Sequence, residues 1–120
     1  MEAVELHERV AKLVNAGDVE GLLDLYEPDA RVVNEDGSLM VGREAFRELI
    51  NELVPLGGRM EITTRFVVDM GDIALLSNEW HFRADDVELS GITAEVARRQ
   101  ADGRWLYVID NPYAVALPEV

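Results

Sequence analysis

The spacing of apolar residues changes once along the chain, near residue 58, and this change constrains the fold more than any other feature. Before it, apolar residues recur every three or four positions, as in amphipathic helices. After it, they alternate with polar residues in four stretches, which predict β-strands over residues 59–69, 73–84, 88–101 and 104–114. Helices followed by strands predict an α+β fold, in which the helices pack on one face of a curved, mostly antiparallel sheet.

The first part of the chain predicts three helices and a short hairpin. The helices run over residues 2–15, from Asp18 to Pro28, and from Arg43 to Pro55. In the second helix, Tyr26 continues the i, i+3, i+4, i+7 apolar pattern. The hairpin joins residues 31–34 to residues 39–41. A chain of 120 residues has room for one hydrophobic core, so we expect a single domain over residues 1–120.

The chain is strongly acidic, with 24 Asp and Glu against 11 Lys and Arg and a formal net charge of −13. This charge would repel the phosphates of nucleic acids and of anionic membranes, so we expect neither as a partner. No apolar stretch approaches the ~20 residues of a membrane span, and the acidic start is unlike a signal peptide. We therefore expect a soluble, cytoplasmic protein.

The chain contains no cysteine and two histidines, which limits its metal and nucleophile chemistry. His7 is assigned to the polar side of the first helix and is predicted to face solvent. His81 falls on the outer face of the sheet beside Glu79, and this pair has no third ligand. We expect no metal site and no cofactor.

The turn at Asp102-Gly103 sets the register of the last two strands. If it is a two-residue loop, Ala97 lies opposite Val108 and Glu95 lies opposite Asp110. Two carboxyl groups facing each other destabilise a sheet unless they share a proton or bind a partner. Paired carboxyl groups can also work as acid and base, so Asp110 and Glu95 are the candidate catalytic residues. An error of one residue in the loop would instead turn one carboxylate to solvent.

The face that carries Glu95 also carries the candidate ligand-binding residues of the preceding strand, and it should receive the helices. The four candidates for substrate binding are Asn34, Asn78, Trp80 and Phe82. An amide on a mostly apolar inner face needs a partner, which is a ligand, a buried water or a backbone group. The two aromatic residues are also consistent with ordinary core packing.

Four short segments and the order of the elements resemble the SnoaL-like and ketosteroid-isomerase-like branch of the nuclear-transport-factor-2-like superfamily. The resemblance covers roughly residues 3–113. The segments are Asn15-Ala16-Gly17-Asp18, Leu25-Tyr26-Glu27-Pro28-Asp29-Ala30, Gly42-Arg43-Glu44 and Arg99-Gln100-Ala101-Asp102-Gly103-Arg104-Trp105. The resemblance implies a cone-shaped fold with three N-terminal helices on the concave face of a strongly curved sheet. It implies no single reaction, since this fold hosts isomerases, cyclases, hydrolases, dehydratases and non-catalytic members.

The resemblance carries over to the site only in part. Where ketosteroid isomerases have their catalytic Asp on the first strand, this sequence has Asn34, and where they have an oxyanion-hole Tyr on the first helix, it has Val10. Their second donor, an Asp kept neutral by an apolar site, corresponds to Glu95. The resemblance therefore argues against steroid isomerisation and implies the same cavity.

Two functions from different classes remain. The first is a cofactor-free isomerase or cyclase that moves a proton next to the carbonyl of a small, largely apolar molecule. The second is a non-catalytic ligand-binding or dimerisation module, which the substitutions at Val10 and Asn34 favour. Epoxide opening between carboxylates is a third alternative, but Arg99 alone shares the face of Glu95 and lies at the rim.

A homodimer is expected from the other face of the sheet. In this register an apolar and aromatic patch faces away from the helices, formed by Val96, Trp105, Tyr107, Ile109 and Tyr113. Monomers rarely leave such patches exposed, and aromatic residues are enriched in interfaces. Members of the resembled family commonly pair through this convex face, which agrees with a dimer.

Overall fold

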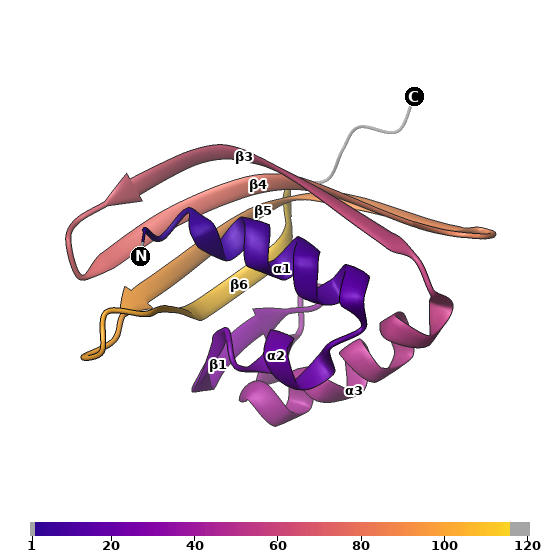
Figure 1. Cartoon of the computed structure of the whole chain (residues 1–120), viewed down its shortest axis with the longest axis horizontal. Helices are drawn as coiled ribbons and strands as arrows, with labels where there is room; N and C mark the ends of the chain where they lie inside the picture. Colours follow the sequence, from indigo (N-terminus) through magenta and orange to yellow (C-terminus); the bar gives the residue numbers. More distant parts are fainter. Residues whose placement is uncertain (1, 116–120) are drawn as a thin grey trace.

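The computed structural model of the chain describes residues 2–115 and has an α+β architecture (Figure 1). The elements in chain order are α1 (Glu5–Ala16), α2 (Val19–Leu23), β1 (Tyr26–Val33), β2 (Leu39–Val41), α3 (Arg43–Leu53), a 3₁₀ turn (Val54–Leu56), β3 (Arg59–Asp69), β4 (Ile73–Ala84), β5 (Val87–Arg99) and β6 (Trp105–Val115). The expected domain of residues 1–120 also includes Met1 and residues 116–120, which lie outside the described residues.

The six strands form one open, curved sheet in the order β2-β1-β6-β5-β4-β3. All neighbours are antiparallel except β1 and β6, which run parallel. Helix α1 lies across the sheet and packs against β3, while α2 and α3 lie together beside β1 (Figure 1). The fold class expected from the change in apolar spacing is therefore confirmed, with the helices on one face of the sheet.

The helix boundaries follow from local signals at their ends. Gly17 ends α1 with a φ of 69°, in the left-handed region that favours glycine. The Asp18 side chain then caps α2 by accepting a hydrogen bond of 2.8 Å from the Gly21 N–H. The prediction for α2 was wrong at its other end, because Tyr26 begins β1. The Tyr107 N–H donates to the Leu25 carbonyl at 2.8 Å, so pairing with β6 prevails over the helical spacing.

The β5–β6 hairpin differs from the predicted one at two places, and the two differences in register cancel near Glu95 and Asp110. The Gln100 N–H donates to the Arg104 carbonyl at 2.7 Å, so the loop has three residues, and Ala97 lies opposite Tyr107. A bulge at Val108 then adds one residue to β6. The expected pairing of Ala97 with Val108 is therefore wrong, whereas the expected pairing of Glu95 with Asp110 is confirmed.

The same bulge changes which face carries the aromatic residues of β6. Trp105 and Tyr107 lie opposite Arg99 and Ala97, before the bulge, and both are buried in the core. Tyr113 packs edge-on against Trp80 with ring centroids 5.6 Å apart. The patch expected on the outer face is thus wrong for these three aromatic residues.

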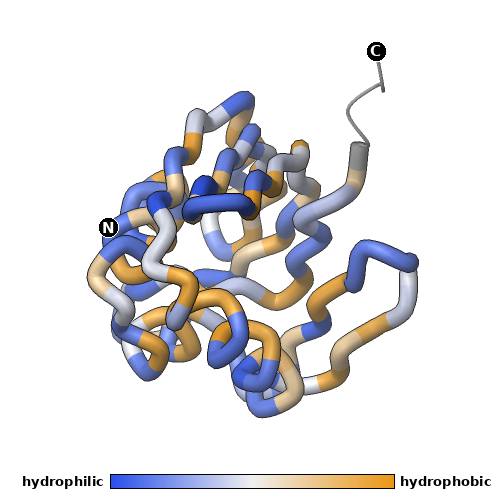
Figure 2. Tube along the Cα trace, turned by 90° about the vertical axis from the view of Figure 1, so that its right-hand side faces the viewer, coloured by the Kyte–Doolittle hydropathy of each residue, from blue (hydrophilic) through white to orange (hydrophobic). Residues whose placement is uncertain are grey.

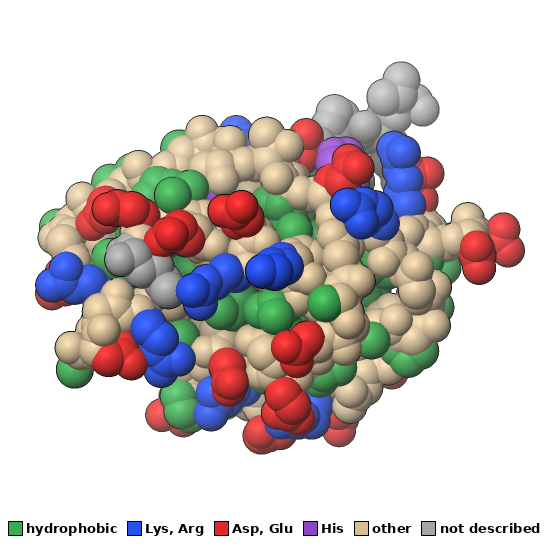
Figure 3. All heavy atoms as spheres, viewed as in Figure 1, with side chains coloured by type: hydrophobic (Ala, Val, Ile, Leu, Met, Phe, Trp, Pro, Cys, Tyr) green, Lys and Arg blue, Asp and Glu red, His purple; other side chains and the backbone are tan. Residues whose placement is uncertain are grey.

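The surface carries mixed charges over the helices. Figure 3 shows acidic and basic side chains interspersed on the face toward the viewer, with hydrophobic atoms between them. Figure 2 shows hydrophobic and hydrophilic residues alternating along the trace. Within residues 2–115, no helix is long and apolar enough to cross a membrane.

Candidate functional site

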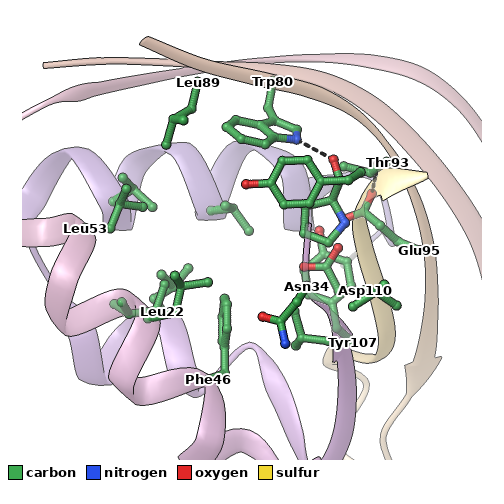
Figure 4. A pocket seen from close by; sticks show the side chains of 18 of the residues that line it. Leu22, Asn34, Phe46, Leu53, Trp80, Leu89, Thr93, Glu95, Tyr107 and Asp110 are labelled. Carbon is green, nitrogen blue, oxygen red and sulfur yellow. Dashed lines mark hydrogen bonds between the residues drawn. The ribbon is translucent and has the colours of Figure 1, made fainter. Parts of the chain in front are cut away.

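A pocket of about 490 Å³ lies between the helices and the concave face of the sheet. This volume lies within the usual range for small-molecule sites. Its walls are mostly apolar and include Val10, Leu22, Phe46, Leu53, Trp80 and Leu89. Figure 4 shows Leu22, Leu53 and Leu89 on one side of the pocket, and Thr93, Glu95 and Asp110 on the other. The pocket therefore has an apolar body and one polar end.

Glu95 lies at this polar end and is held by three hydrogen bonds to a single oxygen. Its Oε1 accepts from His7 Nε2 at 2.7 Å, from the Thr93 hydroxyl at 3.0 Å and from Asn78 Nδ2 at 3.2 Å. The side chain is 3% exposed. Buried carboxyl groups require such donors, and donors from three elements fix the orientation of Glu95.

His7 is the site residue that the sequence analysis placed wrongly, because it is buried and does not face solvent. Helix α1 packs its His7 side against β3, where the ring Nδ1 lies 2.7 Å from Thr64 Oγ1 while Nε2 contacts Glu95. The signal was present in the sequence, since His7 lies four residues after Ala3 and three before Val10, on the apolar side of the helix.

Asp110 faces Glu95 across the strands and binds its proton unusually tightly. Burial, followed by the negative charge of Glu95, raises the pKa of Asp110 to about 8, although the hydrogen bond from Tyr26 opposes the rise. The Tyr26 hydroxyl donates to Asp110 Oδ2 at 2.7 Å. At neutral pH Asp110 is therefore mostly a neutral acid. Because Oδ2 already accepts from Tyr26, we assign the proton to Oδ1, which has no partner among the described residues.

Three polar atoms at this end of the pocket are buried without a hydrogen-bond partner among the described residues. They are Asn78 Oδ1, the Tyr107 hydroxyl and Asp110 Oδ1. All three residues line the pocket. Burial and the nearby Glu95 charge raise the pKa of Tyr107 well above its usual value, so its hydroxyl keeps its proton. Unpaired buried polar atoms are rare in proteins and commonly mark a site for a ligand or water.

The other predicted binding residues lie in different places. Asn34 lines the pocket, and its Nδ2 donates to Ser38 Oγ at 3.0 Å. Trp80 also lines the pocket, and its indole N–H donates to the Pro112 carbonyl at 2.8 Å, as the dashed line in Figure 4 shows. Phe82 is buried in the core outside the lining, against the backbone of Gly58, where a side chain would collide with the ring.

The charged residues that line the pocket are all acidic. Besides Glu95 and Asp110, they are Glu35 and Asp36 of the β1–β2 turn. No Lys, Arg or His is among the described lining residues. His81 lies half-buried elsewhere, with Nε2 3.5 Å from Glu79 Oε2. Across residues 2–115 there is no group of three or more His, Cys, Asp or Glu arranged to hold a metal ion.

Residues 7–111 match the SnoaL-like domain family, and the chain therefore belongs to that family. This confirms the family expected from the four sequence segments. No curated protein matches the chain.

Several solved structures share the fold at low sequence identity. An NTF-2-like protein of unknown function from Shewanella oneidensis is 16% identical, with a TM-score of 0.80 over 90% of this chain and 93% of that chain. A conserved protein from Planctomyces limnophilus is 17% identical, with a TM-score of 0.80 over 93% and 92%. A ketosteroid isomerase-like protein from Erwinia carotovora atroseptica is 15% identical, with a TM-score of 0.71 over 90% and 89%. These similarities establish the fold, and the reaction has to be argued from the site.

Proposed function

We propose that this protein binds a small, largely apolar carbonyl compound in its pocket and transfers a proton at the carbon next to the carbonyl, as an isomerase or cyclase without a cofactor. One observation supports this above all: Glu95 and Asp110 face each other at the polar end of an apolar pocket, and Asp110 keeps its proton at neutral pH. Where two carboxyl groups share one site, one can serve as the acid and the other as the base.

The two carboxyl groups take different parts in the reaction. Glu95, which accepts three hydrogen bonds, is the base and takes the proton from carbon. The C–H electron pair forms the C=C bond of an enol, while the carbonyl π pair moves to oxygen. Asp110 Oδ1 gives its proton to that oxygen. In a β,γ-unsaturated carbonyl compound the product is a dienol. Glu95 then returns its proton to the far carbon of the dienol, while the carbonyl re-forms and the O–H proton goes back to Asp110, which gives the α,β-unsaturated isomer.

His7 is a positioning residue in this scheme. It does not line the pocket, but its bonds to Thr64 and Glu95 link α1, β3 and β5 behind the base. A base that its neighbours hold in one orientation spends less time in orientations that cannot react, so the reaction is faster.

Hydrogen–deuterium exchange tests the proposal without knowledge of the natural substrate. In D₂O, we expect the protein to accelerate exchange of the protons next to the carbonyl of 2-tetralone, followed by NMR. Glu95→Gln should reduce the acceleration by about 100-fold or more, as expected for the loss of a general base. Asp110→Asn should reduce it less, since an amide still donates a hydrogen bond.

The matched control is Glu79→Gln, because Glu79 is a half-exposed carboxylate on β4 outside the pocket lining. This variant should accelerate exchange of the 2-tetralone protons as much as wild type does. Equal rates for wild type and Glu95→Gln, in folded protein with 2-tetralone bound, would overturn the catalytic proposal. That result would instead support a non-catalytic ligand-binding module. Val10 and Asn34 favour this second candidate, since they stand where the resembled isomerases have their hydroxyl donor and base.

A further inference from the structure

The three unpaired atoms at the polar end of the pocket differ in what they can bind, and this difference defines a class of ligand. A carbonyl oxygen can only accept hydrogen bonds, whereas a hydroxyl or a protonated acid can also donate. The orientation of each group therefore determines which hydrogen-bonding groups a ligand has to bring.

Asn78 needs a donor from the ligand. Its Nδ2 donates to Glu95 Oε1 at 3.2 Å, and its backbone N–H donates to Thr93 Oγ1 at 2.9 Å. Turning the amide over would place its oxygen against Glu95 Oε1, where two acceptors would repel each other. The amide is thus held with Oδ1 as its unpaired atom, and this atom can only accept.

Asp110 and Tyr107 need an acceptor from the ligand. The Tyr26 hydroxyl already occupies Asp110 Oδ2, so the acid proton is available at Oδ1. Tyr107 is fully buried, and its hydroxyl is also unpaired. Both groups lie close to Glu95, whose charge acts on each of them. The acceptor and the two donors therefore belong to one end of the pocket.

The lining also excludes one kind of polar group. Four carboxyl groups line the pocket, and no Lys, Arg or His accompanies them among the described lining residues. A carboxylate or phosphate on the ligand would have no counter-charge and would be repelled. The polar end of the ligand is therefore uncharged or cationic. An ammonium group has no acceptor and would leave the Asp110 and Tyr107 donors unpaired, so an uncharged oxygen fits better.

We propose that the ligand is an uncharged, otherwise apolar molecule with a hydroxyl group at its polar end. This hydroxyl donates to Asn78 Oδ1 while its oxygen accepts from Tyr107, which leaves Asp110 Oδ1 to the carbonyl oxygen. A simple ketone satisfies the two donors and leaves Asn78 unpaired. This inference rests on the proposed function only in using the same pocket, and it narrows the substrate to hydroxyl-bearing carbonyl compounds.

Four naphthalenes that differ in the substituent at position 1 test the ligand class: 1-ethylnaphthalene, 1-acetylnaphthalene, 1-(1-naphthyl)ethanol and 1-naphthoate. Their dissociation constants can be measured by NMR titration, with the indole N–H of Trp80 as a reporter in the pocket wall. We expect the alcohol to bind about tenfold tighter than the ketone, the effect of about one additional hydrogen bond. The hydrocarbon should bind more weakly than the ketone, and 1-naphthoate should bind weakest.

A variant then locates the preference. Asn78→Leu should bring the affinities for alcohol and ketone to within about twofold of each other. Ser77→Ala is the matched control, because Ser77 is the adjacent buried polar residue and does not line the pocket, and it should keep the wild-type ratio. The comparison of alcohol with ketone in wild type holds even if Asn78→Leu does not fold.

The outcomes separate this inference from the proposed function. If the ketone binds as tightly as the alcohol to wild type, or if 1-naphthoate binds tightest, the hydroxyl-bearing class is wrong. Absence of binding by all four probes at millimolar concentration also contradicts it. In each case the exchange experiment with 2-tetralone decides separately whether the carboxyl pair transfers a proton.

Discussion

On both faces of the sheet a few positions depart from the usual distribution of residues. On the inner face, Glu95 and Asp110 are only 3% and 7% exposed. On the outer face, Leu75 and Ile109 are 43% and 42% exposed, and half-buried Val96 lies between them in register. Antiparallel sheets that cover a core on one side commonly place apolar residues inside and polar residues outside.

Each departure has a cost that a binding partner would remove. On the inner face, buried carboxyl and amide groups lose their hydration. The three atoms Asn78 Oδ1, Tyr107 Oη and Asp110 Oδ1 also have no hydrogen-bond partner among the described residues. Outside, large apolar side chains remain in water. The comparison supports the proposed small-molecule ligand on the inner face and the predicted protein partner on the outer face.

Asp110→Asn should change stability more than any other substitution on the inner face, and its advantage over wild type should grow as pH rises from about 4 to about 8. The wild-type folded state keeps the Asp110 proton up to a pH of about 8, whereas the ordinary pKa is 3.8. The free energy of unfolding therefore falls as pH rises from about 4 to about 8, by at most about 6 kcal/mol at ~1.4 kcal/mol per pKa unit. Asparagine cannot ionise, so this loss should disappear in the variant.

Urea denaturation at pH 5, 7 and 9 measures the effect as the difference between wild type and variant. The groups that act on Asp110 are Glu95 on β5 and Tyr26 on β1, and both remain in the variant. Asp102→Asn is the control, since Asp102 is exposed and its pKa is lowered by bonds from Arg104, so it is ionised throughout this range. A difference that stays constant from pH 5 to pH 9 would show that Asp110 is solvated and the inner face is not unusual.

His7→Leu should have the next largest effect and lower the free energy of unfolding by about 3 kcal/mol. The change removes the donor to Glu95 Oε1 and the partner of Thr64, and it leaves a buried carboxyl group with fewer hydrogen bonds. His81→Leu provides the matched control, because His81 is half-exposed and its substitution should cost no more than about 0.5 kcal/mol. Equal effects of the two substitutions would contradict a structural link between α1 and the base.

The arrangement of elements could be predicted because it follows from patterns that each segment carries by itself. The change from helical to alternating spacing at Arg59 and the Asp18 cap are both local signals. The pairing of Glu95 with Asp110 was also predicted, although the loop is one residue longer than expected. The bulge at Val108 compensates for that residue, and nothing in the local sequence indicates where a bulge lies.

The rest of the site depends on contacts between distant segments, which local patterns do not contain. Tyr26 donates to Asp110, 84 residues later, because β1 pairs with β6. Tyr107 reaches the pocket only because it precedes the bulge. His7 could have been recovered from its helical spacing, but its partner Glu95 lies 88 residues away. The rule that places a polar helix residue in solvent fails for His7, because the site buries it.

The smallest expected effect concerns self-association through the outer face. The homodimer stays a prediction, but the surface that supports it is no longer the aromatic patch expected from the sequence. Cross-strand pairing places four apolar residues in one row over β3, β4, β5 and β6, namely Val68, Leu75, Val96 and Ile109. The row carries no charge, so two copies of a chain with net charge −13 can meet there with the least repulsion. A row of this kind is also self-complementary, as a twofold interface requires.

Sedimentation equilibrium at micromolar concentration tests this prediction, with twice the 13.4 kDa chain mass as the expected result. Leu75→Glu should raise the dissociation constant at least tenfold, because it places a charge at the centre of the row. Leu39→Glu is the matched control, since Leu39 is also an exposed leucine but lies on β2 at the far edge of the sheet. This substitution should leave the mass doubled. Tyr107 is unsuitable for such a test because it is buried in the core. A wild-type mass near 13.4 kDa would exclude the dimer, and an equal effect of both substitutions would place the interface elsewhere.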